Sequence, residues 1–417
     1  MKLIPAVLLC TALSLPMLYA QDHPLPYAPE ETLWFEQPAT DWRTQALHLG
    51  NGYMGISFYG GVETESFDIA EKTFWTGGPN VTPDYNYDIK PGGKAHIGEL
   101  RQLIVAGDYF AADSVARQHF MGDNNGYGYF SKVGMLHLDF APNEEPVSDY
   151  VRGLDVALPL GFVRYTTGKV KHSREYFCSY PDHLLAVHIE TNQPGHVSFR
   201  LRPEWQYPAE RAEVVNDKEC YIRGLIDKSG LKYGVRIRMM NVGGKLVCTP
   251  NEFSISQADE TTLLFTVETE YRAEPPTYKG NQPERVTAAT FKQIEHITYE
   301  ALKQRHLEDY RTLNDRVTFH LEGDQELTQL PTDERVKRLQ AGLTDDSALK
   351  ALWFNLGRYM IISASRKGTL PSNLQGACNH FEAAPWNGIY QNNINLQEMY
   401  WSCGPTDLPE CQESYID

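Results

Sequence analysis

The sequence lacks the positive charge that binding to nucleic acid or to an anionic membrane surface requires. Its 417 residues carry 38 Lys and Arg against 54 Asp and Glu, which gives a net charge of -16. Binding to phosphate groups depends on clustered cations. We therefore expect neither nucleic acid nor an anionic membrane as a partner, and a small or neutral ligand fits the composition better.

The sequence also lacks a long apolar run after its N-terminus, where about 18 residues would be needed to cross a membrane. The N-terminus itself is typical of an export signal, with Lys2, an apolar core from Leu3 to Leu18, and Ala20 before the expected cleavage point at Gln21. Leu9 before Cys10 is a poor match to a lipid-anchor site. We predict a signal peptide over residues 1–20 and a periplasmic or secreted product.

Cysteine is scarce and has no metal-binding pattern. Neither CxxC pairs nor neighbouring histidines occur at ligand spacing, so no metal site and no cofactor are predicted. A chain of this size does not need disulfides to fold, although an oxidising compartment would permit them. We expect the six cysteines beyond the signal to be buried or free, namely Cys178, Cys220, Cys248, Cys378, Cys403 and Cys411.

Glycine-rich turns near the N-terminus lack the Lys-Ser/Thr pair of a phosphate-binding loop. Gly50-Asn51-Gly52 and Gly60-Gly61 instead bracket a strand-like run, Tyr53 to Tyr59, as in a β-hairpin. Residues 95–117 predict a helical interruption, and short alternating strands then continue to about Glu270. This pattern indicates a large antiparallel β-sandwich.

The strand pattern ends at a Pro-rich and Gly-rich boundary, residues 275–283. Residues 284–317 contain neither Gly nor Pro and carry apolar residues at helical spacing, so one or two connecting helices follow. Further helices are predicted over 333–340 and 347–365, the second with Ser347 as N-cap. The apolar stripe of that second helix must be buried against other elements.

The stretch Thr369 to Trp401, TLPSNLQGACNHFEAAPWNGIYQNNINLQEMYW, is rich in Asn, Gln, Trp and Tyr. Amides donate to and accept from hydroxyl groups, and aromatic rings stack on sugar faces, so this composition suits a sugar site. Asn393 and Asn395 would share one face if the backbone were extended. Asn-rich loops also commonly satisfy their own backbone through Asx turns, and both interpretations stay open on these residues alone.

Several long motifs resemble glycoside hydrolase family 95, the α-L-fucosidases. They are LWFEQPATDWRTQALHLGNGYMGISFYGGVETE with EKTFWTGGP, REYFCSYPDHLLAV (174–187), HLEDYRTLNDRV (306–317), LPTDERV (330–336) and GTLPSNLQG with PWNGIYQNNINLQEMYW. The resemblance runs from about Glu31 to the last residue.

The resemblance implies a multi-domain β + α protein. The expected parts are an N-terminal antiparallel β-super-sandwich (21–274), a helical linker (275–329) and the first helices of an incomplete (α/α)6 barrel (330–417), truncated within the catalytic domain. It also implies inverting hydrolysis of α-L-fucosides, or of related L-galactosides, in a fucosylated oligosaccharide or glycan.

In the family, two Asn of an Asn-x-Asn motif hold the attacking water, and these carry over to Asn393 and Asn395. Gln391 would share the face of Asn393 in an extended segment and contact the sugar. The family's acid Glu and activating Asp are expected beyond residue 417. Glu382 and Glu398 are the carboxylates nearby in sequence, and a solvated or helix-capping role is favoured for each.

Three functions stay open from the sequence. The first is an exported fucosidase of which this chain is an N-terminal fragment that is inactive alone. In that fragment we expect Leu352, Leu356, Tyr359 and Met360 to lack packing partners. The second is a non-catalytic carbohydrate-binding β-sandwich with a remnant helical tail. The third is a glycoside phosphorylase, which would need an anion pocket that the motifs do not show.

Overall fold

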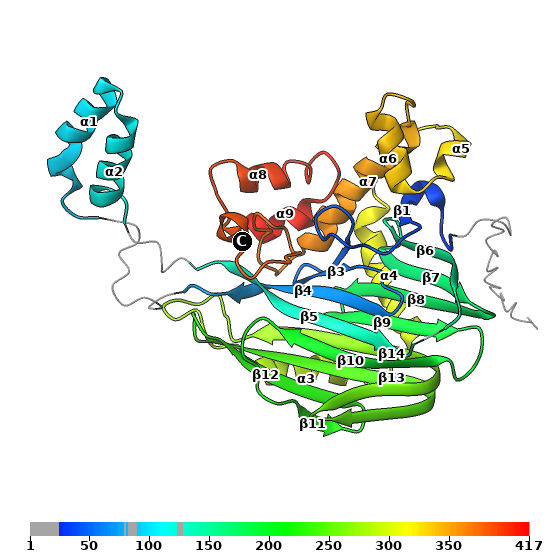
Figure 1. Cartoon of the computed structure of the whole chain (residues 1–417). Helices are drawn as coiled ribbons and strands as arrows, with labels where there is room; N and C mark the ends of the chain where they lie inside the picture. The colour runs from blue at the N-terminus through cyan, green and yellow to red at the C-terminus, as the bar shows by residue number, and fades with distance from the viewer. Residues whose placement is uncertain (1–24, 79–80, 82–89, 123–127, 143, 417) are drawn as a thin grey trace, which may run out of the picture.

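A computed structural model describes residues 25–78, 81, 90–122, 128–142 and 144–416. Figure 1 shows a large curved antiparallel sheet with helices packed on it. The last strand ends at Thr269 and the next helix begins at Pro283, so the predicted change from strands to helices is confirmed. The predicted signal peptide, residues 1–20, lies outside the described residues, and the division into domains stays a prediction.

The described residues form one antiparallel sheet of fourteen strands. The strands are β1 (Thr32–Phe35), β2 (Leu47–Gly50), β3 (Met54–Phe58), β4 (Thr64–Trp75), β5 (Phe130–Phe140), β6 (Val147–Asp155), β7 (Leu160–Thr167), β8 (Val170–Ser179), β9 (Leu184–Thr191), β10 (Val197–Trp205), β11 (Glu213–Asn216), β12 (Glu219–Ile226), β13 (Leu231–Thr249) and β14 (Glu252–Thr269).

The sheet divides into two arms at β14. Residues 253–258 of β14 pair with β10, which leads through β5, β4 and β3 to β2. Residues 260–265 pair with β9, which leads through β8, β7 and β6 to β1. Along its other edge β14 pairs with β13, which continues to β12 and β11. The long β13–β14 hairpin therefore joins both arms.

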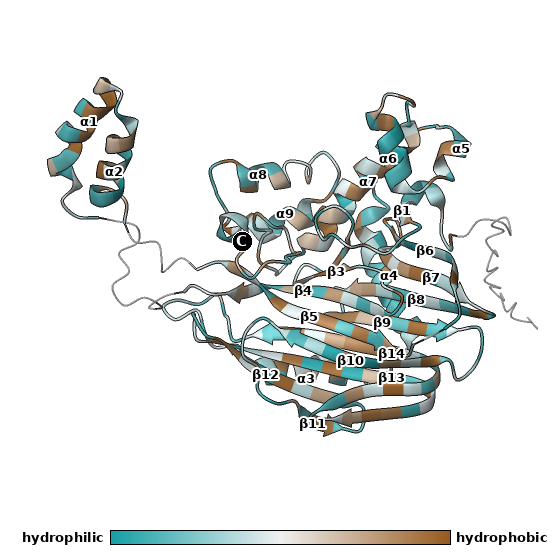
Figure 2. Ribbon diagram, in the orientation of Figure 1, coloured by the Kyte–Doolittle hydropathy of each residue, from teal (hydrophilic) through white to brown (hydrophobic). Residues whose placement is uncertain are grey.

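Aromatic side chains fill the space between the two arms. Phe58 of β3 and Phe67 of β4 both pack edge-on against Tyr176 of β8, with ring centroids 5.0 Å and 5.2 Å apart. All three rings are buried. Figure 2 shows hydrophobic and hydrophilic residues alternating along several strands, as expected where one face of a strand is buried.

The helical interruption predicted over 95–117 consists of two helices, α1 (Ile97–Ala106) and α2 (Tyr109–His119), after a short 3-10 turn, η2 (Gly93–His96). The break falls at Gly107, whose φ of 77° ends α1 in the left-handed conformation. Asp108 then caps α2, because its carboxylate accepts a hydrogen bond from the Ala111 amide at 3.0 Å.

The predicted linker helices are α3 (Pro283–Gln293) and α4 (Tyr299–Asn314). They lie on the sheet, α3 against β13 and β14 and α4 against β8. Phe291 and Leu302 of these helices form a buried cluster with Phe177 and Leu264 of the sheet. The segment therefore covers one face of the sheet in addition to connecting two parts of the chain.

The remaining elements surround the same sheet. They are η1 (Pro29–Glu31), α5 (Gln325–Thr328), α6 (Thr332–Gln340), α7 (Ser347–Ala364), η3 (Pro385–Gly388), α8 (Asn395–Tyr400) and α9 (Pro409–Ile416). Within the part of the chain that the structure describes, no helix is both long enough and apolar enough to span a membrane. The six cysteines of the described residues are free, as predicted.

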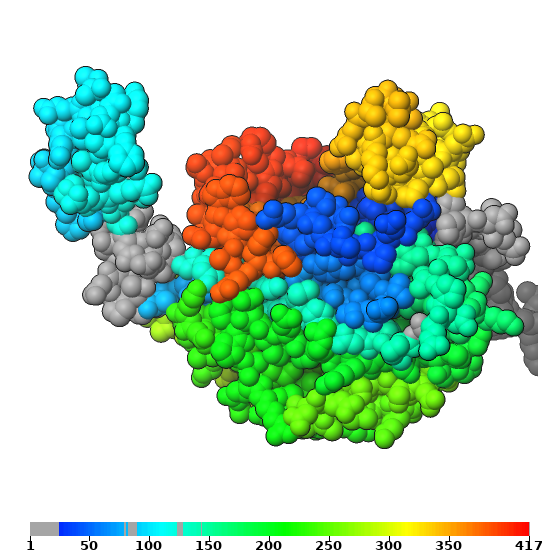
Figure 3. All heavy atoms as spheres, viewed as in Figure 1, coloured from blue at the N-terminus to red at the C-terminus, as the bar shows by residue number. Residues whose placement is uncertain are grey.

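The prediction that α7 would lack partners is wrong for three of its four residues, because Leu352 and Tyr359 belong to the core and Leu356 packs against it. Leu352 is fully buried and Tyr359 is 2% exposed, and the Tyr359 hydroxyl donates to the His48 carbonyl oxygen at 2.6 Å. Leu356 is half-buried, whereas Met360 is 55% exposed as expected. The sheet supplies the missing surface, because α7 packs on β2 and β3. Figure 3 shows the N-terminal strands, in blue, directly beneath the C-terminal segments.

The junction of α6 and α7 corrects a second detail. Asp346, not Ser347, is the N-cap of α7, and its carboxylate accepts from the Leu349 amide at 2.8 Å. The same carboxylate forms a buried bidentate ion pair with Arg335, at 2.8 Å and 2.9 Å. The Asp346 carboxylate therefore caps α7 and also links α7 to α6 through Arg335. A serine hydroxyl has no charge and could not form that ion pair.

Candidate active site

The 369–401 segment is joined to the start of β5 by backbone hydrogen bonds and to β4 by the Lys72 side chain, which donates to the Leu370 carbonyl. The Lys132 amide donates to the Phe381 carbonyl at 3.1 Å, and the Ala384 amide donates to the Phe130 carbonyl at 3.2 Å. At the other end, the Tyr400 hydroxyl accepts from the Ser372 amide at 2.8 Å. These contacts hold an irregular loop on a rigid sheet, the usual arrangement of a binding loop.

The structure does not support an extended backbone at the predicted Asn pair. Asn395 is the first residue of α8, and the preceding residues 392–394 form a turn. Gln391 has a φ of 47°, outside the extended region. The shared face predicted for Gln391 and Asn393, and for Asn393 and Asn395, from strand geometry is therefore wrong. Helix nucleation at Asn395 overrides the alternation that an extended chain would give.

The three predicted site residues nevertheless lie at the surface. Asn393 and Asn395 are exposed and Gln391 is half-buried. The Asn393 side-chain oxygen accepts from the Ile394 amide at 3.1 Å, whereas the Asn395 amide has no hydrogen bond within the described structure. Across the described residues, no carboxylate is hydrogen-bonded to either amide. The pair can orient a water molecule, but a base has to come from elsewhere.

Backbone strain concentrates in the same segment. Trp386, Asn387 and Gln391 have φ values of 49°, 58° and 47°, a left-handed conformation that costs non-glycine residues about 1 to 3 kcal/mol each. Gly388 makes the turn possible, because a Cβ there would lie 2.7 Å from the Phe130 Cβ. Strain held in place by a tight turn is a feature that clusters at ligand sites.

Aromatic side chains surround this turn. Trp386 is 75% exposed, and the half-buried Trp75 at the end of β4 stacks on Tyr390 with centroids 6.2 Å apart. Burial raises the pKa of Tyr390, so its hydroxyl stays protonated as a hydrogen-bond donor. The exposed Trp386 indole beside free amides can stack on a sugar, and the amides can bond to its hydroxyl groups.

The two carboxylates nearby in sequence differ in their surroundings. Glu382 accepts a long hydrogen bond from the Tyr129 hydroxyl at 3.4 Å. Glu398 is exposed and has no hydrogen bond or ion pair in the described part of the chain. Neither is bonded to the Asn pair, so the structure gives neither a catalytic position.

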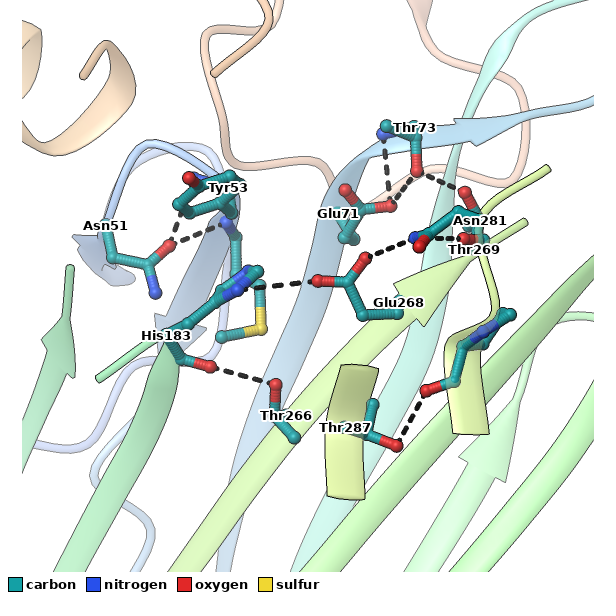
Figure 4. Close-up of polar contacts among 12 residues, drawn as sticks. Asn51, Tyr53, Glu71, Thr73, His183, Thr266, Glu268, Thr269, Asn281 and Thr287 are labelled. Atoms are coloured by element: carbon teal, nitrogen blue, oxygen red, sulfur yellow. Dashed lines mark hydrogen bonds and ion pairs between the residues drawn. The ribbon is translucent and has the colours of Figure 1, made fainter. Parts of the chain in front are cut away.

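Sequence reasoning missed a buried acidic pair beneath the segment. Figure 4 shows Glu71 of β4 next to Glu268 of β14, with His183 on one side and Asn281 and Thr73 on the other. Glu71 accepts from the Thr73 amide at 3.1 Å, and Glu268 accepts from the Asn281 side chain at 3.1 Å. The EKTFW motif contained the signal, since Glu71 interrupts a buried strand.

The pKa values of both carboxyl groups are raised to near or above neutral pH. Burial raises the pKa of Glu71 to about 7, and burial together with the Glu71 charge raises the pKa of Glu268 to about 8. His183 lies 3.4 Å from Glu268, and burial lowers its pKa to about 4. Near pH 7, Glu268 is therefore mostly protonated and His183 mostly neutral, while Glu71 is at the midpoint of its titration.

The described residues also contain one His-Glu-Glu group with ligand atoms within 4.8 Å of one another, formed by His188, Glu190 and Glu260. His188 is already held by Thr262 at 2.9 Å and stacked on Tyr299. It lies on β9 and β14 under α4 and does not contact the 369–401 segment.

Comparison with known proteins identifies the class and then indicates the family. Residues 33–274 match the N-terminal domain of glycosyl hydrolase family 65, which places the chain among the glycoside hydrolases. Residues 298–417 match the glycosyl hydrolase family 95 catalytic domain, which supports the fucosidase-like family that the motifs predicted.

Curated relatives agree with the family. The chain is 31% identical to Alpha-L-fucosidase 2 of Arabidopsis thaliana, over 92% of this chain and 48% of that protein. It is 26% identical to Probable alpha-fucosidase A of Aspergillus niger, over 93% and 50%. The chain thus spans about half the length of these relatives. Among solved structures, a putative kojibiose phosphorylase from human microbiome is similar, with a TM-score of 0.48 at 9% identity, over 84% and 44%.

Proposed function

We propose that this chain is part of an exported glycoside hydrolase that removes terminal α-L-fucose, or related L-galactose, from glycans with inversion. The observation that carries the proposal is the 369–401 segment, in which strained backbone holds free amides and exposed aromatics on a rigid sheet. Its match to the family 95 domain and its relatives named as fucosidases support the same substrate class. Export rests on the N-terminal signal pattern.

In this proposal, Asn393 and Asn395 orient the attacking water and Gln391 contacts the sugar. An inverting hydrolase needs an acid for the leaving oxygen and a base for the water, with about 6.5 to 9.5 Å between the two carboxyl groups. A neutral amide has no useful basicity, so the Asn pair positions water and a carboxylate takes the proton. Within the described residues no carboxylate contacts the pair, and we propose that these 417 residues do not turn over fucosides alone.

The direct test measures fucose release from a 2'-fucosylated oligosaccharide. The 417-residue chain should release none, and a form extended through the rest of a family 95 catalytic domain should release fucose with inversion. Robust inverting hydrolysis by the 417-residue chain would instead require an acid among its own carboxylates, with Glu382 and Glu398 as first variants.

Gln391 provides the test of sugar choice. L-Fucose and L-galactose differ by a hydroxyl group at C6, which an amide can bind. In the extended form, Gln391→Ala should change the ratio of activity on matched fucosides and L-galactosides, whereas the exposed Gln293→Ala on α3 should not. An unchanged ratio for Gln391→Ala removes this residue from the specificity argument.

A carbohydrate-binding role without catalysis is the second candidate, and the exposed Trp386 and Trp401 favour it. Both candidates predict glycan binding by the chain. They differ in turnover by the extended form, which only the hydrolase predicts.

A further inference from the structure

A cavity of about 710 Å³ lies between the N-terminal strands and α6. Figure 3 shows the N-terminal residues, in blue, beside the helices of this region, in gold. The volume is in the range of sites for small organic ligands. The lining residues used below come from the loop after β1 (Phe35, Glu36, Gln37), from Gln45, from β6 (Arg152) and from the α5–α6 region (Gln329 to Arg338).

Arg152 is a buried cation without an ionic partner. Its side chain is 1% exposed, stacks over the Phe35 ring at 4.3 Å and donates from Nε to the Gln37 carbonyl at 2.7 Å. Its Nη1 has no hydrogen-bond partner, and no carboxylate of the described residues lies within ion-pair distance. A buried guanidinium normally has a carboxylate, because an uncompensated buried charge is costly. Here Arg152 lines a cavity, and its buried Nη1 is left without a partner.

The first turn of α6 lines the same cavity. Its N-cap, Pro331, offers no side-chain cap. The Glu334 and Arg335 amides donate to the Pro331 carbonyl at 3.0 Å, which leaves the Thr332 and Asp333 amides without an acceptor in the described part of the chain. The two acidic residues of this turn are neutralised along the helix, Asp333 by Lys337 at 3.0 Å and Glu334 by Arg338 at 2.9 Å. The turn therefore adds positive potential to that of Arg152.

Three of the other polar side chains in the lining are amides, beside Thr44 and the carboxylate of Glu36. The Gln45 side-chain oxygen accepts from Thr40 and Asp41, so its NH2 group remains as a donor. Gln37 and Gln329 also line the cavity. Amides that surround an unpaired guanidinium suit a ligand with hydroxyl groups and one planar oxyanion, which an arginine binds through parallel hydrogen bonds.

We propose that this cavity binds the carboxylate of an acidic sugar, such as a uronic acid residue, with Arg152 and the α6 N-terminus as the anion contacts. The site does not involve the 369–401 segment and does not depend on the hydrolase proposal.

The test is a ligand-observed NMR titration of the 417-residue chain with glucuronate, galactose and inorganic sulfate. Glucuronate should bind, and galactose should bind at least about tenfold more weakly because it lacks the anion. Arg152→Met, which keeps the packing on Phe35, should weaken glucuronate binding at least about tenfold and leave galactose binding unchanged. The exposed Arg200→Met on β10 is the matched control.

A second variant keeps the test decisive if Arg152→Met does not fold. Glu36 is the exposed carboxylate of the lining without a cation partner in the described part of the chain. Glu36→Gln should therefore tighten glucuronate binding about two- to threefold. Equal binding of glucuronate and galactose, no binding of glucuronate, or binding of sulfate alone would each overturn the proposal, as would unchanged glucuronate affinity in Glu36→Gln.

Discussion

Polar side chains of the sheet and of the 369–401 segment differ in what they bind. In the sheet, Glu65 is fully buried, and its oxygens accept from the Gly60 and Ser66 amides at 2.8 Å and 3.0 Å and from the Tyr176 hydroxyl at 2.8 Å. In the segment, Asn395 is exposed, and its amide has no bond within the described residues. The Glu65 carboxylate thus fixes the geometry of the sheet, whereas the Asn395 side chain stays free of such bonds within the described structure.

The largest effect on stability should come from a buried polar residue of the sheet, Glu65. Glu65→Ala removes the carboxylate that neutralises the buried Arg174, 3.6 Å away. It also leaves the Gly60 and Ser66 amides and the Tyr176 hydroxyl without their acceptor. We expect the free energy of unfolding to fall by about 3 to 5 kcal/mol, measured by denaturant titration. The exposed Glu63→Ala, two residues away, should change it by less than about 0.5 kcal/mol. Equal losses in the two variants would contradict the comparison.

The segment should show the opposite behaviour. Asn395→Ala should leave the melting temperature unchanged, because the side chain has no protein partner to lose. In the extended form it should lower kcat about 10²- to 10³-fold, as expected for loss of a group that positions the reacting atoms. The neighbouring exposed Asn392→Ala is the control and should retain activity. A parallel loss of stability and activity would assign Asn395 a structural role.

A smaller effect is expected from the buried acidic pair, and it depends on pH. The folded-state pKa of Glu71 is about 7 and that of Glu268 about 8, both above the unfolded value near 4.5. The folded state therefore binds more protons, and this contribution to stability is lost as pH rises from about 5 to 8.

Glu71→Gln and Glu268→Gln should remove that loss. Each variant should match the wild type near pH 5 and exceed its free energy of unfolding by about 1 to 3 kcal/mol at pH 8.5. Thermal unfolding across this range checks the prediction, with the exposed Glu63→Gln as control. A difference that does not change with pH would show that the two carboxyl groups titrate normally.

The smallest effect should be at Trp386, where strain and exposure coincide. Trp386→Gly removes both the ring and the left-handed strain, whereas Trp386→Ala removes the ring alone. We expect Gly to be more stable than Ala by about 0.5 kcal/mol, and both to weaken binding of a fucosylated oligosaccharide about equally. Glycan binding that survives in both variants would exclude Trp386 as a stacking platform.

Sequence patterns predicted the elements well, because strand alternation and helical spacing are local. The same patterns could not predict that Leu352 and Tyr359 would be buried, since their partners on β2 and β3 lie about 300 residues earlier. The predicted face shared by Asn393 and Asn395 depended on an extended backbone, which the start of α8 replaced.

The partners of buried charged side chains also could not be predicted from the sequence. The residues next to Arg152 or Glu71 in the sequence do not indicate whether the folded chain places a charged partner beside them. Arg152 lies beside residues from loops about 115 positions away, and Glu71 meets Glu268 only because β14 runs beside β4 in space. Such pairs follow from topology, which composition does not specify.

The long-range ties of the N-terminal strands also set an order of events during synthesis. The Trp34 amide of β1 donates to the Thr332 hydroxyl, 298 positions later, and Lys72 of β4 donates to the Leu370 carbonyl, again 298 positions later. At about 5 to 20 residues per second, a ribosome needs about 15 to 60 s to supply those partners. The open edge of β1 must therefore wait for α6, and the Lys72 side chain for the 369–401 segment, both of which are made late in this chain.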